Sequence, residues 1–119
     1  MKIVISSSDG KPESPVDPGF GRAAKFLVFD TESDRFEIVN NDQNLHAAQG
    51  AGIQAAETVA RLGAEYLLTG HCGPKAFMVL KAAGIKICTG VEGTAAEALA
   101  RFRAGEIVPA EGADVDGHW

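Results

Sequence analysis

The residues best suited to hold a metal or an anion gather in three short, glycine-bearing segments. These segments are residues 17–22, 70–75 and 89–94. The middle one places His71 beside Cys72, and these side chains are borderline and soft metal ligands. Arg22 and Lys75 add positive charge. The candidate cofactor-binding residues are Gly19, Phe20, Gly21, Arg22, Gly70, His71, Cys72, Gly73, Pro74, Lys75, Gly90, Val91, Gly93 and Thr94. Within this set, His71 and Cys72 are the candidates for direct contact with a metal.

Simple structural roles account for several of these residues equally well. Thr94 is followed three positions later by Glu97, the spacing of a capping box at the start of a helix. Cys72 is as well explained as a small core side chain as it is as a ligand, and Cys88 is best explained by packing. Lys75 also fits a solvated surface charge. The residues alone therefore indicate a site for something anionic and do not identify it.

Other chemistries fit the sequence poorly. Residues 50–55 match the dinucleotide pattern G-x-G-x-x-A, but no strand precedes them, so a glycine-rich helix start is favoured. Residues 70–75 lack the Gly-Lys-Ser/Thr ending of a phosphate loop. Asp9 and Asp30 end adjacent predicted strands and offer a weak case for a hydrolase; turn capping and an ordinary strand end explain them better. No cysteine spacing indicates zinc.

The segments that position these residues alternate between predicted strands and helices. The expected strands are residues 2–6, 25–29, 36–39, 65–69 and 85–88. The expected helices are residues 51–62, 74–83 and 95–104. The second helix is apolar on nearly every side, so we expect it to be well buried.

The order of these elements, βββαβαβα, predicts an α/β domain. We expect a mixed five-stranded sheet with helices on both faces. Strands 65–69 and 85–88 should be parallel because a helix crosses between them. The second and third glycine-bearing segments then follow the carboxyl ends of parallel strands, where open α/β sheets collect ligands.

Composition and charge narrow the class of protein. The 119 residues suit a single domain, which we place at residues 1–108, followed by an acidic, flexible tail at 109–119. A net charge of −5 without a basic stripe argues against nucleic acid as a partner. Two cysteines are too few for a secreted disulfide scaffold. No segment has the length of a membrane span or a signal peptide, so we expect a cytoplasmic protein that does not bind membranes.

An ordered set of short motifs resembles one known family. The set comprises Phe20-Gly21-Arg22-Ala23, Phe26, Asp30, Gly50-Ala51-Gly52, Thr69-Gly70, Gly73-Pro74, Ala76-Phe77 and Ala83-Gly84-Ile85-Lys86. It is similar to the dinitrogenase iron–molybdenum cofactor family, accessory proteins of nitrogenase cofactor biosynthesis, over residues 1 to about 107. The resemblance implies a ribonuclease H-like three-layer domain. The chain departs from many relatives at Cys72 and Lys75, where those relatives have isoleucine and asparagine.

The resemblance implies a non-catalytic carrier of an anionic metal–sulfide cluster. Within the family, the chain most resembles members that hold a molybdenum–copper sulfide cluster without covalent attachment. An iron–molybdenum cofactor or its precursor is the alternative cargo. The alternative role is a regulatory or adaptor domain that binds a partner protein, such as a P-loop ATPase, and no cluster. Because relatives also occur in cells that do not fix nitrogen, a role in nitrogenase assembly does not follow.

Overall fold

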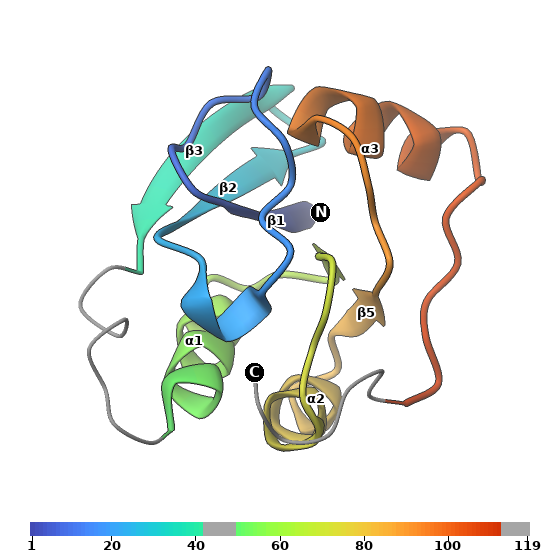
Figure 1. The fold of residues 1–119 in the computed structure, drawn as a ribbon. Coiled ribbons are helices and arrows are strands. Elements are labelled where there is room, and N and C mark those ends of the chain that lie inside the picture. Colours follow the sequence, from blue (N-terminus) through green and yellow to red (C-terminus); the bar gives the residue numbers. More distant parts are fainter. Residues whose placement is uncertain (42–49, 113–119) are drawn as a thin grey trace.

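A five-stranded sheet lies between helices in the computed structural model, which describes residues 1–41 and 50–112 (Figure 1). The strands are β1 (Lys2–Ser7), β2 (Lys25–Asp30), β3 (Arg35–Asn40), β4 (Tyr66–Leu68) and β5 (Lys86–Cys88). The helices are α1 (Ala51–Arg61), α2 (Pro74–Ala82), α3 (Ala95–Arg103) and a short 3-10 turn, η1 (Phe20–Arg22). Every predicted strand and helix is present, with boundaries within two residues of those expected. Only η1 was not predicted as a helical element.

The strands follow the order β3-β2-β1-β4-β5 across the sheet. β1, β4 and β5 run parallel, whereas β2 and β3 are antiparallel additions beside β1. The predicted mixed sheet and the parallel pairing of β4 with β5 are therefore confirmed. The ribonuclease H-like relationship stays a prediction.

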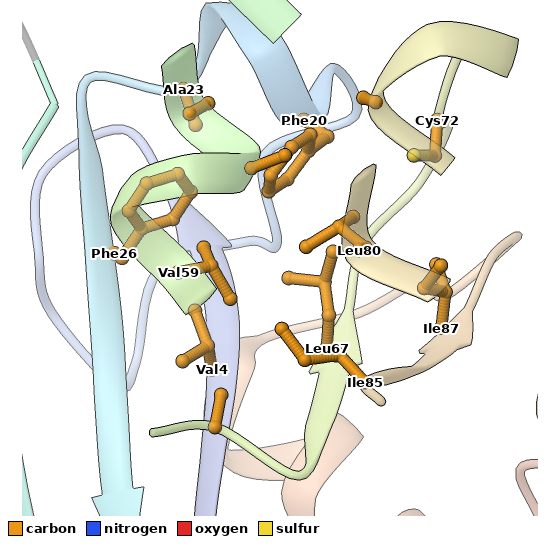
Figure 2. Close-up of a cluster of buried hydrophobic side chains, with 14 of the residues drawn as sticks. Val4, Phe20, Ala23, Phe26, Val59, Leu67, Cys72, Leu80, Ile85 and Ile87 are labelled. Atoms are coloured by element: carbon orange, nitrogen blue, oxygen red, sulfur yellow. The ribbon is translucent and has the colours of Figure 1, made fainter. Parts of the chain in front are cut away.

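Alternating side chains of the central strand β1 contribute to two cores. Because neighbouring residues of a strand point to opposite faces, Val4 packs with Val59 of α1 and Leu80 of α2, as Figure 2 shows. Ile3 packs on the other face, with Leu99 of α3. The predicted helices on both faces are thus confirmed: α1 and α2 cover one face, and α3 covers the other.

Helix α2 is buried along one stripe only. Ala76, Phe77 and Leu80 face the core, but the side chain of Met78 is 71% exposed, and Lys81 is also exposed. The prediction that this helix is well buried is therefore wrong. A helix packed against one side of a sheet buries one face, whatever the composition of the other.

The parallel strands place three loops at one edge of the sheet. The η1 loop (residues 17–22) lies beyond the end of β1, the β4–α2 loop (residues 70–75) follows β4, and the β5–α3 loop (residues 89–94) follows β5. These are the three candidate segments. Among the described residues, no helix is both long and apolar enough to cross a lipid bilayer.

The proposed domain limit at residue 108 and the loose tail beyond it stay predictions. Ala110, inside the predicted tail, donates a backbone hydrogen bond to Ile87 O at 2.7 Å. The remainder of the tail, residues 113–119, and the polar stretch 42–49 lie outside the described residues.

Candidate functional site

Backbone hydrogen bonds join the η1 loop directly to the β4–α2 loop. The His71 N–H donates to Pro18 O at 2.7 Å, and the Phe20 N–H donates to His71 O at 3.1 Å. Gly70 makes this approach possible, because a Cβ atom there would lie 2.6 Å from Pro18 Cα. The two loops therefore form one continuous surface.

The β5–α3 loop joins the same edge through its backbone. The Gly90 N–H donates to Gly70 O at 2.7 Å, and the Val91 N–H donates to Thr69 O at 3.1 Å. The Val16 N–H, just before the η1 loop, donates to Gly93 O at 2.9 Å. The structure thus brings all three predicted segments together.

The candidate side chains differ sharply in exposure. Arg22 and Lys75 are exposed, and His71 is partly buried. The side chains of Phe20 and Cys72 have no exposed surface. Figure 2 shows both side chains in one buried cluster with Leu80. Pro74, Gly90 and Gly93 are exposed, whereas Gly19, Gly21, Gly70, Gly73 and Val91 are buried and Thr94 is partly buried.

The two helix starts at this edge have different electrostatic character. Gly73 precedes α2 and supplies no side-chain cap, and the first turn of α2 contains no acidic residue. At α3, the Thr94 side chain accepts a hydrogen bond from Glu97 N, and the Glu97 carboxylate accepts one from Thr94 N. These bonds hold the pKa of Glu97 below its usual value. The start of α3 is thus already capped and carries an anion of its own, whereas the start of α2 keeps its positive dipole end.

Helix α1 also begins near the edge of the sheet where the three loops lie. Just after its last turn, the Glu65 N–H donates to Lys2 O, which places the end of α1 at the amino end of β1. Its first residue is preceded by Gly50, which has a φ of 81° and no side-chain cap. The interpretation of the G-x-G-x-x-A match as a glycine-rich helix start is therefore confirmed.

The two cysteines lie in separate cores. Cys72 packs on the α1–α2 face, where its Sγ donates to Gly73 O at 3.7 Å, and Cys88 packs on the α3 face. Burial raises the pKa of the Cys88 thiol to about 11, which disfavours the thiolate that metal ligation requires. Within residues 1–41 and 50–112, no three His, Cys, Asp or Glu side chains are grouped to hold a metal ion.

Asp9 and Asp30 do not form a joint site. Asp30 pairs with Lys2 at the start of β1, whereas Asp9 follows the end of the same strand. A six-residue strand separates its ends by roughly 17–20 Å. The Asp9 carboxylate accepts hydrogen bonds from Ser14 Oγ and Lys11 N, which hold its pKa below the usual value. The predicted turn role of Asp9 is confirmed. The hydrolase alternative is not supported, because the two carboxylates do not share a site.

Sequence analysis missed the polar side chains beneath the loops. Ser6, Asn41 and Thr69 have no exposed surface. Asn41 Nδ2 donates to Ala23 O at 2.8 Å, directly after η1. Thr69 is part of a family motif and Ser6 ends the first predicted strand, but the sequence pattern did not predict that either holds the loops. The available signal was a run of small hydroxyl residues at the end of an otherwise apolar buried strand.

Comparison with known proteins identifies the family. A family model described as "Dinitrogenase iron-molybdenum cofactor" matches residues 1–105. The chain belongs to this family. The resemblance found in the sequence motifs is therefore confirmed over nearly the span that was expected.

Solved structures agree with this assignment. The chain is similar to the orange protein from Desulfovibrio gigas, solved in its apo form, with 42% identity, 96% of each chain covered and a TM-score of 0.93. A protein from Thermotoga proposed to be NifB shares 34% identity over 91% of each chain, with a TM-score of 0.79. An uncharacterized protein of Methanocaldococcus jannaschii is 29% identical over 90 residues, which are 73% of this chain and 72% of that protein. The three-layer fold of this chain is the fold of the orange protein.

Proposed function

We propose that this chain binds and carries an anionic metal–sulfide cluster at the surface formed by the η1 loop and the β4–α2 loop. Membership of the iron–molybdenum cofactor family supports a cluster as cargo. Likeness to the orange protein, whose solved structure is described as its apo form, supports the same role. Of the two cargoes considered, the resemblance favours a molybdenum–copper sulfide cluster over an iron–molybdenum cofactor or its precursor.

The observation that supports this role most strongly is the electropositive start of α2. Its first N–H groups have no side-chain cap, and its dipole is equivalent to about half a positive charge at this end. Lys75 lies in the same turn, and Arg22 lies on η1, which is hydrogen-bonded to the β4–α2 loop. In a chain with a net charge of −5, this edge is suited to attract an anion.

We propose that the cluster is held without a metal–cysteine bond. Cys72 belongs to the core beneath the loops, so Arg22, Lys75 and backbone N–H groups are left to face the sulfide atoms. The proposed contact set is therefore the glycines of the η1 and β4–α2 loops with Arg22, His71, Pro74 and Lys75. The β5–α3 loop, with Gly90, Val91, Gly93 and Thr94, supports this surface from one side.

We further propose a carrier and not an enzyme, and we assign no catalytic residue. The described residues offer no feature that favours the adaptor alternative, in which the chain binds an ATPase and no cluster. A carrier needs only shape, hydrogen-bond donors and charge at the site, and these are the properties of the α2 start.

Charge neutralisation provides the test. Replacing Arg22 and Lys75 together by glutamine should weaken uptake of a cluster assembled from tetrathiomolybdate and copper(I), by about tenfold at low salt. The affinity of the variant should also depend less on salt than that of the parent. Binding is followed by visible absorbance and metal content between about 0.05 and 0.5 M sodium chloride.

The matched control is Arg61→Gln with Lys86→Gln. These exposed cations lie at the end of α1 and the start of β5, at the opposite edge of the sheet, and their loss changes the net charge equally. The control should bind like the parent. Equal affinity and equal salt response in the site variant and the control would contradict the proposal.

A further inference from the structure

We propose that Ser6 and Thr69 are positioning residues: their buried hydroxyl pair fixes the η1 loop against the carboxyl ends of β1 and β4, and so sets the loop surface that receives the cluster. The inference rests on the proposed function for its consequence in binding. Its structural part concerns the free protein alone and is tested separately below.

The pair lies at the point where the carboxyl ends of β1 and β4 meet. The Ser6 and Thr69 hydroxyl oxygens are 2.8 Å apart, and neither side chain has any exposed surface. Ser6 Oγ also donates to Asp17 O at 2.8 Å, and the Asp17 N–H donates to Ser6 O at 2.9 Å. Ser6 therefore holds the first residue of the η1 loop by both its side chain and its backbone.

The direction of the hydroxyl–hydroxyl bond follows from counting protons. Ser6 has one O–H, and the Asp17 carbonyl can only accept, so the Ser6 proton is used there. The Thr69 hydroxyl must then donate to Ser6 Oγ. A chain of two hydrogen bonds thus runs from Thr69 through Ser6 to the Asp17 carbonyl, and each bond polarises the next.

The backbone of Thr69 connects the same point to the other two loops. It directly precedes the β4–α2 loop, whose His71 N–H binds Pro18 O. Its own carbonyl accepts from Val91 N, and its N–H donates to Cys88 O, so it also fixes both ends of the turn into the β5–α3 loop.

Removing either hydroxyl should make the loops more mobile without removing a group that contacts the cluster. A buried hydroxyl without its partner loses a bond that water cannot replace. The loops would then sample several arrangements in the free protein, and binding would have to order them again. The effect should be greatest on retention of the cluster, because the ordered arrangement is what opposes its release.

The first experiment compares three variants with the parent after loading with tetrathiomolybdate and copper(I). Thr69→Val keeps the shape and removes the donor, Thr69→Ser keeps the hydroxyl, and Ser6→Ala removes both side-chain bonds. Release to a chelator should be about tenfold faster for Thr69→Val, at least as fast for Ser6→Ala, and close to the parent rate for Thr69→Ser. The visible circular dichroism of the bound cluster should change in Thr69→Val and recover in Thr69→Ser.

The matched control is Thr58→Val. Thr58 is also buried, and its hydroxyl donates to Gln54 O at 3.1 Å within α1, away from the loops. The Thr58→Val substitution removes a hydroxyl by the same chemical change as Thr69→Val, so it controls for a general loss of stability. Unchanged release and dichroism in Thr69→Val, or the same change in Thr58→Val, would overturn the proposal.

The second experiment needs no cluster. In the free protein, amide hydrogen exchange at His71 and Gly90, both donors in the loop–loop bonds, should become faster in Ser6→Ala and Thr69→Val than in Thr58→Val. Unchanged exchange would contradict the locking role even if the chain binds no cluster. Faster exchange with a parent that takes up no metal would instead leave the lock in place and contradict the proposed function. If Ser6→Ala does not fold, the comparison of Thr69→Val with Thr69→Ser decides the matter.

Discussion

At the scale of single residues, the two cysteines show how far residue type determines a role. Cys88 was expected to fill the core, and it does so on the α3 face. For Cys72 the sequence left two roles open, because a small soft side chain after a strand suits either the core or a ligand. Its burial depends on which way the chain turns between β4 and α2, and that turn is set by contacts with the distant η1 loop. No local pattern in the sequence encodes that direction.

This placement yields a prediction for both cysteines. Cys88→Ala should keep the cluster and lower the free energy of unfolding by about 1 kcal/mol, the packing loss of one small buried group. Cys72→Ser should weaken retention modestly without abolishing it, because it places a hydroxyl among apolar side chains below the site. Metal content and denaturant unfolding are measured for both variants beside the parent. A folded Cys72→Ser protein that binds no metal at all would make Cys72 a ligand.

At the scale of elements, the first residues of the helices could be predicted from the sequence better than the loop surface that they help to form. The Thr94–Glu97 spacing predicted a capping box, and both of its hydrogen bonds are present. Pro74 predicted the first residue of α2. The turn η1 was not predicted as helical, because three residues have little local preference. Its geometry depends on His71, some fifty positions later in the chain.

The contrast between α2 and α3 leads to a prediction for Thr94. Because its side chain is engaged in the capping box, Thr94→Ala should lower the free energy of unfolding by about 1 kcal/mol. It should change the affinity for the cluster little, since Thr94 belongs to the supporting loop and not to the proposed contact set at the start of α2. Thermal unfolding and cluster titration of the same preparation separate the two effects. A large loss of affinity without a loss of stability would place Thr94 in the site.

At the scale of the whole molecule, the layers of the fold could be predicted from the sequence, but the direct contact between the loops could not. The alternation of strands and helices led to a mixed sheet with helices on both faces, as observed. The parallel strands β4 and β5 then place two of the loops at one edge. Their direct contact depends on Gly70, where any side chain would collide with Pro18, and on the buried Ser6–Thr69 pair. In the sequence, the only sign of such long-range contacts is the presence of small residues.

Positive charge is concentrated at the proposed site, although the protein as a whole is acidic. Arg22, Lys75 and the start of α2 share the edge where β1 and β4 end. Glu92 and Glu97 lie on the other side of that edge, beside the capped start of α3. Arg101 lies beside these two carboxylates, so the positive charge on that side is already paired, and an anionic cluster is attracted more strongly to the side of Arg22 and Lys75.

The most direct test of the central claim is the metal content and colour of the full chain purified from its own cells under mild, non-reducing conditions. The account predicts a coloured protein with visible absorbance, containing molybdenum with copper, or molybdenum with iron, together with sulfide that is released by acid. The metal should be retained on a sizing column in the parent and depleted in the Arg22→Gln, Lys75→Gln double variant. A folded, colourless parent that contains no metal, and that takes up none from tetrathiomolybdate and copper(I), would contradict the account.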